Sequence, residues 1–210
     1  MKKLIILLAL AAVFMPLAAQ EEEKEDALEL YRNGQYERAI EVCQGELDIY
    51  GEDEVNKKLD SYNVMCWSFM RLGRYDDAIN FGQQALSIFR YDQRVIETMG
   101  EAHFYKGENI NALGYFEQYA VLNPTGQRIE NAYYYMGEIY IRLGEFAHAD
   151  IALSTALYHS PNVAGWWSRL GYAKEMGEDK EGALVAYKQA VELQPDNEAA
   201  LSGLERLQGS

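Results

Sequence analysis

Residues 133–161, YYYMGEIYIRLGEFAHADIALSTALYHSP, decide the fold. Large apolar residues recur at helical spacing over 133–140, and Gly144 then interrupts the pattern. Helical spacing resumes over 149–156, and Pro161 ends it. The stretch therefore predicts two amphipathic helices joined by a tight glycine turn, which is a helical hairpin.

The same pattern returns along the chain. The alanines at the equivalent site of each second helix are Ala39, Ala78, Ala112, Ala149 and Ala183. Glycines at the matching site of three first helices are Gly100, Gly137 and Gly171. These small residues are expected where the two helices of a hairpin approach closely. A single hairpin cannot bury its apolar face alone, so the repeats predict stacked hairpins over 27–195.

The repeat resembles a known family. Its W-x2-L-G, A-x3-F and P positions correspond here to Trp167, Leu170, Gly171, Ala183, Tyr187 and Pro195. At a period of ~34 residues this pattern resembles the tetratricopeptide repeat (TPR) family over 24–208. The resemblance implies an all-α, right-handed α-solenoid of about five hairpins, whose first helices line a concave groove. It also implies a C-terminal capping helix within 196–210.

The helix ranges follow from the repeat. The expected hairpins are 27–33 with 36–50, 60–72 with 76–90, 93–106 with 109–122, 129–143 with 146–159, and 163–176 with 179–194. In the fifth hairpin Gly177 is the turn glycine, one residue early. A last helix is expected over 198–208, with Leu201 and Leu204 packed on the fifth hairpin.

The N-terminus has the pattern of a secretory signal peptide. Two lysines precede an apolar run over 4–14, and Leu17-Ala18-Ala19 supplies small residues for cleavage near Ala19–Gln20. A retained membrane anchor is the alternative, but the run is shorter than the ~20 residues that a spanning helix needs. Residues 1–19 are therefore expected to be removed, leaving no membrane span, and 20–26 to form an acidic disordered leader. The protein is expected to be exported, either periplasmic or secreted.

Charge and motif content exclude several function classes. The formal net charge is −14, which disfavours nucleic acid as a ligand because phosphate binding needs a basic surface. The acidity is also typical of a solvated surface. The sequence has no HExxH pair, Gly-rich phosphate loop or G-x-S-x-G motif. We therefore expect no enzyme activity, no cofactor and no metal site, and we expect His103 to be a packed core residue.

The sequence is compatible with two states of the two cysteines, a disulfide or two free thiols. Cys43 lies late in the second helix of the first hairpin, and Cys66 occupies a small packing site in the next helix. Export would permit a disulfide between them. Two buried free thiols fit the repeat pattern equally well and are favoured, because helix packing often leaves Cα atoms beyond the ~4.4–6.8 Å that a bridge requires.

A surface is the remaining candidate for function. On the first helices, the face opposite the packed stripe mixes aromatic, arginine and acidic residues, which is a recognition signal, although any single aromatic could instead fill a gap between helices. The expected partner-binding residues are Asn63, Trp67, Arg71, Arg94, Glu101, Tyr105, Tyr134, Glu138, Arg142 and Tyr172.

Two functional classes follow. The first is a non-enzymatic protein–protein interaction scaffold, exported from the cytoplasm, that binds a peptide or partner segment in the concave groove. The second is a structural subunit of a cell-envelope assembly that uses its convex face or its ends. The partner's identity and the oligomeric state stay open at this level.

Overall fold

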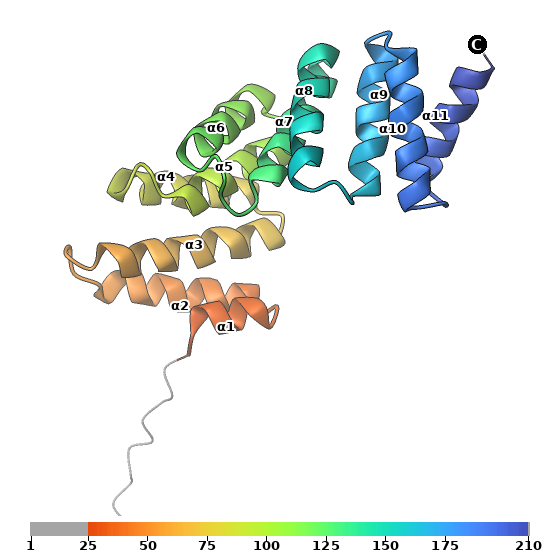
Figure 1. Ribbon diagram of the computed structural model, residues 1–210. Coiled ribbons are helices and arrows are strands. Elements are labelled where there is room, and N and C mark those ends of the chain that lie inside the picture. Colours follow the sequence, from red (N-terminus) through yellow and green to blue (C-terminus); the bar gives the residue numbers. More distant parts are fainter. Residues whose placement is uncertain (1–24, 210) are drawn as a thin grey trace, which may run out of the picture.

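The computed structural model describes residues 25–209, and within this range it is entirely helical (Figure 1). The predicted signal peptide and residues 20–24 of the predicted leader lie outside the described residues. Of the leader, Glu25 pairs with Arg38, and Asp26 caps the first helix by accepting the backbone N–H of Glu29 at 2.9 Å. Among residues 25–209, no helix combines the length and the apolar composition needed to cross a membrane.

Within residues 25–209, ten helices pair into five hairpins, and an eleventh helix follows them. The hairpins are α1 (Ala27–Arg32) with α2 (Tyr36–Ile49), α3 (Val55–Arg71) with α4 (Tyr75–Ile88), α5 (Gln93–Tyr105) with α6 (Asn109–Leu122), α7 (Ile129–Leu143) with α8 (Phe146–His159), and α9 (Ala164–Met176) with α10 (Lys180–Leu193). The last helix is α11 (Glu198–Gln208).

One helix starts earlier than the repeat predicts. The sequence places its start at residue 60, whereas α3 begins at Val55. The extra turn carries Val55 and Leu59, which pack against Val95 and Met99 of α5. Apolar burial against the next repeat therefore extends the helix into the expected connector.

Four hairpin turns contain a glycine in the left-handed backbone region, with φ between 70° and 77°. These glycines are Gly34, Gly73, Gly107 and Gly144. In the fifth turn Gly177 comes one residue early, as the sequence indicates, and Glu178 holds the left-handed conformation at φ 68°. Glu178 therefore carries a backbone strain that the other turns avoid by using glycine.

Close helix contacts explain the glycines inside the first helices. A Cβ added at Gly137 would lie 2.6 Å from Leu153 Cγ, and one added at Gly171 would lie 2.6 Å from Tyr187 Cδ1. Both distances are far inside van der Waals contact. The prediction that these residues permit close approach within a hairpin is confirmed.

The curvature of the stack follows from which helices touch. Consecutive first helices contact each other directly, from α3 to α5, α5 to α7 and α7 to α9. Within residues 25–209 no consecutive second helices do so. The first helices therefore line the inner face, and the second helices spread apart on the outer face (Figure 1).

Helix α11 closes the C-terminal end of the stack. It packs through Ala200 and Gly203, with Gly203 lying directly on the ring of Tyr187. Leu204 is partly buried there, as expected. The expectation that Leu201 also packs is wrong, since it is 39% exposed.

Candidate functional site

The inner face carries a groove made of three adjoining hollows. Their volumes are ≈ 420, ≈ 430 and ≈ 240 Å³, and they run along α1, α3 and α5. Arg94 borders the first and second hollows. Trp67, Glu97 and Arg128 border the second and third. These shared walls show that the three hollows adjoin one another.

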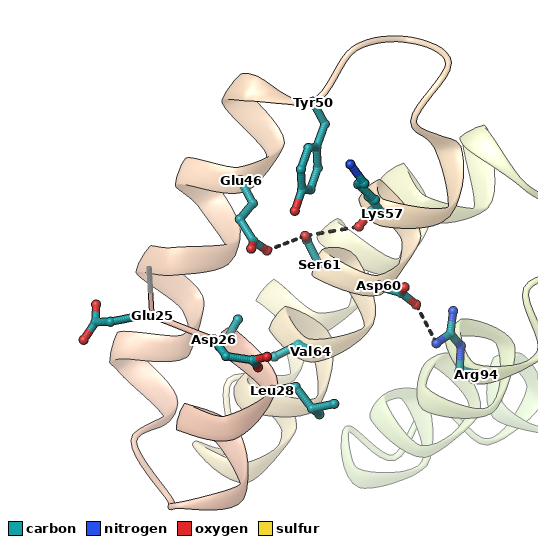
Figure 2. A pocket seen from close by; sticks show the side chains of 11 residues that line it. Glu25, Asp26, Leu28, Glu46, Tyr50, Lys57, Asp60, Ser61, Val64 and Arg94 are labelled. Carbon is teal, nitrogen blue, oxygen red and sulfur yellow. Dashed lines mark hydrogen bonds and ion pairs between the residues drawn. The ribbon is translucent and has the colours of Figure 1, made fainter. Parts of the chain in front are cut away.

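Figure 2 shows the first hollow, at the N-terminal end of the groove. Ser61 donates to Glu46 at 2.8 Å across the gap between α2 and α3. Arg94 reaches back from α5 to Asp60 on α3 at 2.8 Å. Both contacts tie neighbouring helices together along the wall of the hollow.

Trp67 stands at the centre of the groove. Its half-buried indole packs against Tyr31 of α1, with ring centroids 5.9 Å apart, and its remaining surface faces the second and third hollows. Trp67 is thus both a packing residue between α1 and α3 and an aromatic wall of the groove.

A three-residue ion cluster lies beside Trp67. Arg128 donates from Nε to Glu97 at 2.5 Å and from an Nη atom to Glu101 at 2.6 Å. Burial raises the pKa of Glu97 to about 7, against the opposing effect of the Arg128 charge. Burial raises the pKa of Glu101 as well. Two shielded carboxylates therefore share one guanidinium.

Two aromatics that the sequence predicts for the groove, Tyr105 and Tyr134, border none of the three hollows and are stacked on their neighbours. Tyr105, 51% exposed, stacks on Tyr75 at 5.4 Å. Tyr134 stacks on Trp166 at 5.1 Å. Among the predicted aromatics, Tyr105 therefore presents the most accessible ring, while Tyr134 presents only part of its face.

The remaining predicted charges are engaged between repeats. Glu138 accepts two hydrogen bonds from Arg169, at 2.6 and 3.0 Å, and the Arg169 guanidinium lies 5.3 Å from the Tyr172 ring. Arg142 stacks on the ring of Phe104 at 3.7 Å. A partner would meet these groups as preorganised pairs rather than as free charges.

Arg71, the counterpart of Arg142 on the second hairpin, lies 5.7 Å from the Tyr36 ring. It also borders the third hollow of the groove. Its guanidinium is therefore held at the rim, where an incoming segment could reach it.

The prediction that Asn63 contacts a partner is wrong. Asn63 is 1% exposed and donates to the carbonyl oxygen of Leu59 at 2.8 Å and to Asp92 at 3.5 Å. Asp92 caps α5. At the equivalent site of the fifth hairpin, Ser168 donates to Asn197, which caps α11. This site therefore joins one repeat to the start of the next.

Arg128 and Arg169 were missed by sequence reasoning. The signal that could have found them is a spacing of 31 residues between a groove glutamate and an arginine of the following repeat. Glu175 and Arg206 repeat the same spacing, with contacts at 2.8 and 2.9 Å. A single helical window does not contain both members of such a pair.

Both cysteines are buried and free in the structure, so the disulfide that the sequence left open is not formed there. The Sγ of Cys66 lies 3.6 Å from the carbonyl oxygen of Ala78. His103 is 6% exposed, stacks on Tyr115 and contacts Glu108 at 2.5 Å. Its predicted place in the core is confirmed.

Comparison with solved structures decides the architecture. YrrB, described as a TPR protein with an unusual peptide-binding site, superposes with a TM-score of 0.72 at 20% identity, over 88% of this chain and 95% of that chain. MamA superposes with a TM-score of 0.70 at 21% identity, over 80% of this chain and 88% of that chain. The fold is a TPR-like helical solenoid.

A longer relative has the same architecture. The Cut9–Hcn1 hetero-tetramer of APC/C matches with a TM-score of 0.69 at 19% identity, over 86% of this chain and 34% of that chain. At these identities, the similarity of this chain to the solved structures concerns the fold alone.

Sequence comparison adds a partial relative. Protein arginine N-methyltransferase 9 of Xenopus laevis is 31% identical over 85 residues, which is 40% of this chain and 10% of that protein. The chain thus spans about a tenth of the curated relative that it matches. No family model matches the chain.

Proposed function

We propose that this protein is a non-enzymatic interaction scaffold whose groove holds an extended segment of a partner protein. The observation that carries the proposal is the succession of three adjoining hollows, which share Arg94, Trp67, Glu97 and Arg128 as walls. A groove along several repeats suits an extended chain better than a compact ligand.

The chemistry of the groove supports a segment of mixed character. Trp67 and Tyr105 offer aromatic area at low entropic cost, as hot-spot residues do. Paired charges such as Arg94–Asp60 can form further hydrogen bonds at their exposed edges without being separated, with Arg94 donating and Asp60 accepting. The partner segment would combine apolar anchors with polar or charged residues.

The experiment combines binding and crosslinking. A photoreactive amino acid at Tyr105 should crosslink the partner from the groove, whereas the same amino acid at Tyr158, which is 84% exposed on α8, should not. The double variant Trp67→Ala, Tyr134→Ala should weaken partner binding by about 2 kcal/mol or more. Full partner binding by a folded double variant would remove the groove from the mechanism.

Because both substituted rings also pack between helices, Tyr105→Ala is the gentler companion variant. It should weaken binding with little loss of helicity, measured by circular dichroism. Equal loss of binding and of helicity in all variants would point to unfolding rather than to a lost contact.

Export belongs to the same proposal. It is supported by the charged start, the short apolar run and the small residues at 17–19. N-terminal sequencing of the protein from its native cell tests this part. A mature chain that begins at Gln20 agrees with export, and one that begins at Met1 contradicts it.

A second candidate is a structural role in a cell-envelope assembly through the outer face. The observation that favours it is a set of apolar side chains exposed on the second helices. Their exposed fractions are 81% for Val121, 67% for Ile151, 84% for Tyr158 and 66% for Val185. Crosslinking to the partner from Tyr158, and not from Tyr105, would favour this role.

A further inference from the structure

Arg128 covers two carboxylates in the middle of the groove. Glu97 and Glu101 lie one turn apart on α5, and their side chains are 13% and 18% exposed. The Arg128 side chain is 53% exposed. The carboxylates therefore form the floor of this part of the groove, and the guanidinium reaches them from the solvent side.

This cluster differs from the other arginine–glutamate contacts between repeats. Arg169 binds Glu138 alone through two hydrogen bonds. Arg128 instead gives one hydrogen bond to each of two glutamates. Above the raised pKa of Glu97, about 7, one positive charge faces two negative charges, so the two carboxylates keep an attraction for cations that Arg128 does not fully satisfy.

The guanidinium also stands between two hollows. Trp67, Glu97 and Arg128 line both the hollow of ≈ 430 Å³ and that of ≈ 240 Å³. Arg128 arises from the segment before α7, where its own φ is 68°. A chain that continues along the groove would therefore meet this side chain and have to pass it.

We propose that Arg128 occupies the site at which a cationic side chain of the partner binds. A basic extended segment displaces Arg128 and places an arginine or lysine on Glu97 and Glu101, with a neighbouring apolar side chain against Trp67. Charge complementarity selects this occupant, because Glu97 and Glu101 together face the single Arg128 guanidinium. The other arginines of these hollows are held elsewhere, Arg94 on Asp60 and Asp92, and Arg71 near the Tyr36 ring. The inference rests on the proposed binding function of the groove.

The exchange is energetically balanced. One guanidinium or ammonium replaces another on the same carboxylates, so neither state leaves both acids without a cation. Arg128 competes with the ligand, so the apparent affinity equals the intrinsic affinity multiplied by the fraction of time that Arg128 leaves the two carboxylates free. Its removal should consequently strengthen the binding of basic segments.

The test uses a displayed library of random 12-residue peptides, selected against the purified wild-type protein and against Arg128→Ala. Selected peptides are resynthesised with a fluorescent label, and also with each arginine replaced by citrulline, which keeps the shape and removes the charge. Arg169→Ala is the matched control, since it breaks an equivalent contact between repeats that does not border these hollows.

The expected result is enrichment of arginine and lysine, about tenfold tighter binding to Arg128→Ala than to the wild type, and at least tenfold weaker binding after citrulline replacement. Arg169→Ala should bind as the wild type does. Glu101→Gln should reduce the preference for arginine over citrulline. This substitution replaces the carboxylate with a neutral amide of similar size, so the fold is expected to persist.

The outcomes separate this inference from the groove proposal. Peptides that lose binding in Trp67→Ala but show no basic preference would overturn the inference and leave the groove proposal standing. An equal increase in peptide affinity in Arg128→Ala and Arg169→Ala would also overturn the inference. A general loosening of the contacts between repeats would then explain both increases. Absence of any peptide that depends on Trp67 would contradict both.

Discussion

Glu97 accepts a hydrogen bond at 2.5 Å from Arg128, the residue that precedes α7. The equivalent residue of the second hairpin, Asn63, contacts Asp92, which precedes α5. One site on the first helices thus touches the start of the next first helix in both repeats. In the third hairpin this contact also lies in the groove. Glu97 therefore both joins two repeats and lines the surface that a ligand would reach.

The stability of the protein should depend on pH through Glu97. Its pKa rises from an ordinary 4.5 to about 7, chiefly through burial, with Glu101 and Glu130 adding to the rise and Arg128 opposing it. The folded state therefore binds more protons than the unfolded state between these values. The stability contributed by Glu97 is fully present below pH 4.5 and is lost as pH rises through 7.

The measurement is chemical unfolding of the wild type and Glu97→Gln from pH 4 to 8. The unfolding free energy of the wild type should fall relative to that of the variant by up to ~3 kcal/mol across the window. Glu192→Gln, at an exposed position, controls for the change in net charge. A constant difference between wild type and Glu97→Gln would contradict the prediction.

Gly137→Leu should destabilise the protein more than Gly144→Ala. The first Cβ alone would lie 2.6 Å from Leu153 Cγ, and overpacking of this kind costs roughly 1–3 kcal/mol or more. Gly144 has no neighbour within 4 Å, so alanine there meets only the strain of φ 74°, about 1 kcal/mol. Unfolding midpoints of the two variants decide the order, and the reverse order would contradict the packing described here.

Glu178→Gly should stabilise the protein by ~0.5–1 kcal/mol, because glycine adopts the left-handed conformation without the steric strain that a side chain causes. The other four hairpin turns have glycine in this conformation. Glu178→Asn is the control for loss of charge, since asparagine tolerates this region better than glutamate does. Urea unfolding measures both variants. A loss of stability in Glu178→Gly would mean that the turn is held by the glutamate side chain.

Arg206→Ala should loosen the capping helix selectively. Arg206 joins α11 to Glu175 of α9 through two hydrogen bonds and also donates to the Tyr187 hydroxyl at 3.3 Å. Its loss should cost about 1 kcal/mol and speed amide hydrogen exchange in α11 before it does so in α3. Arg90→Ala, at an exposed position after α4, is the matched control. Uniform acceleration along the chain would argue against a local role.

Much of the architecture was readable from local pattern. Helical spacing, turn glycines and the small residues at Ala149 and Gly137 are short-range features, and they predicted the hairpins because a hairpin is built from neighbouring segments. The error at Val55 arose because its helix is extended by contacts with α5, in the next repeat. The sequence places Gly177 one residue early in the fifth turn, and the backbone accordingly puts Glu178 in the left-handed position.

The sequence by itself determined that this chain is a stack of helical hairpins and that its first helices carry aromatic and charged residues on one face. Only the tertiary structure decided which of those residues meet. It buried Asn63 at a repeat junction, engaged Glu138 with Arg169, and brought Arg128 over Glu97 and Glu101. The physical reason is distance along the chain: these partners lie 27 to 31 residues apart, so helical periodicity carries no information about their contact until the repeats stack.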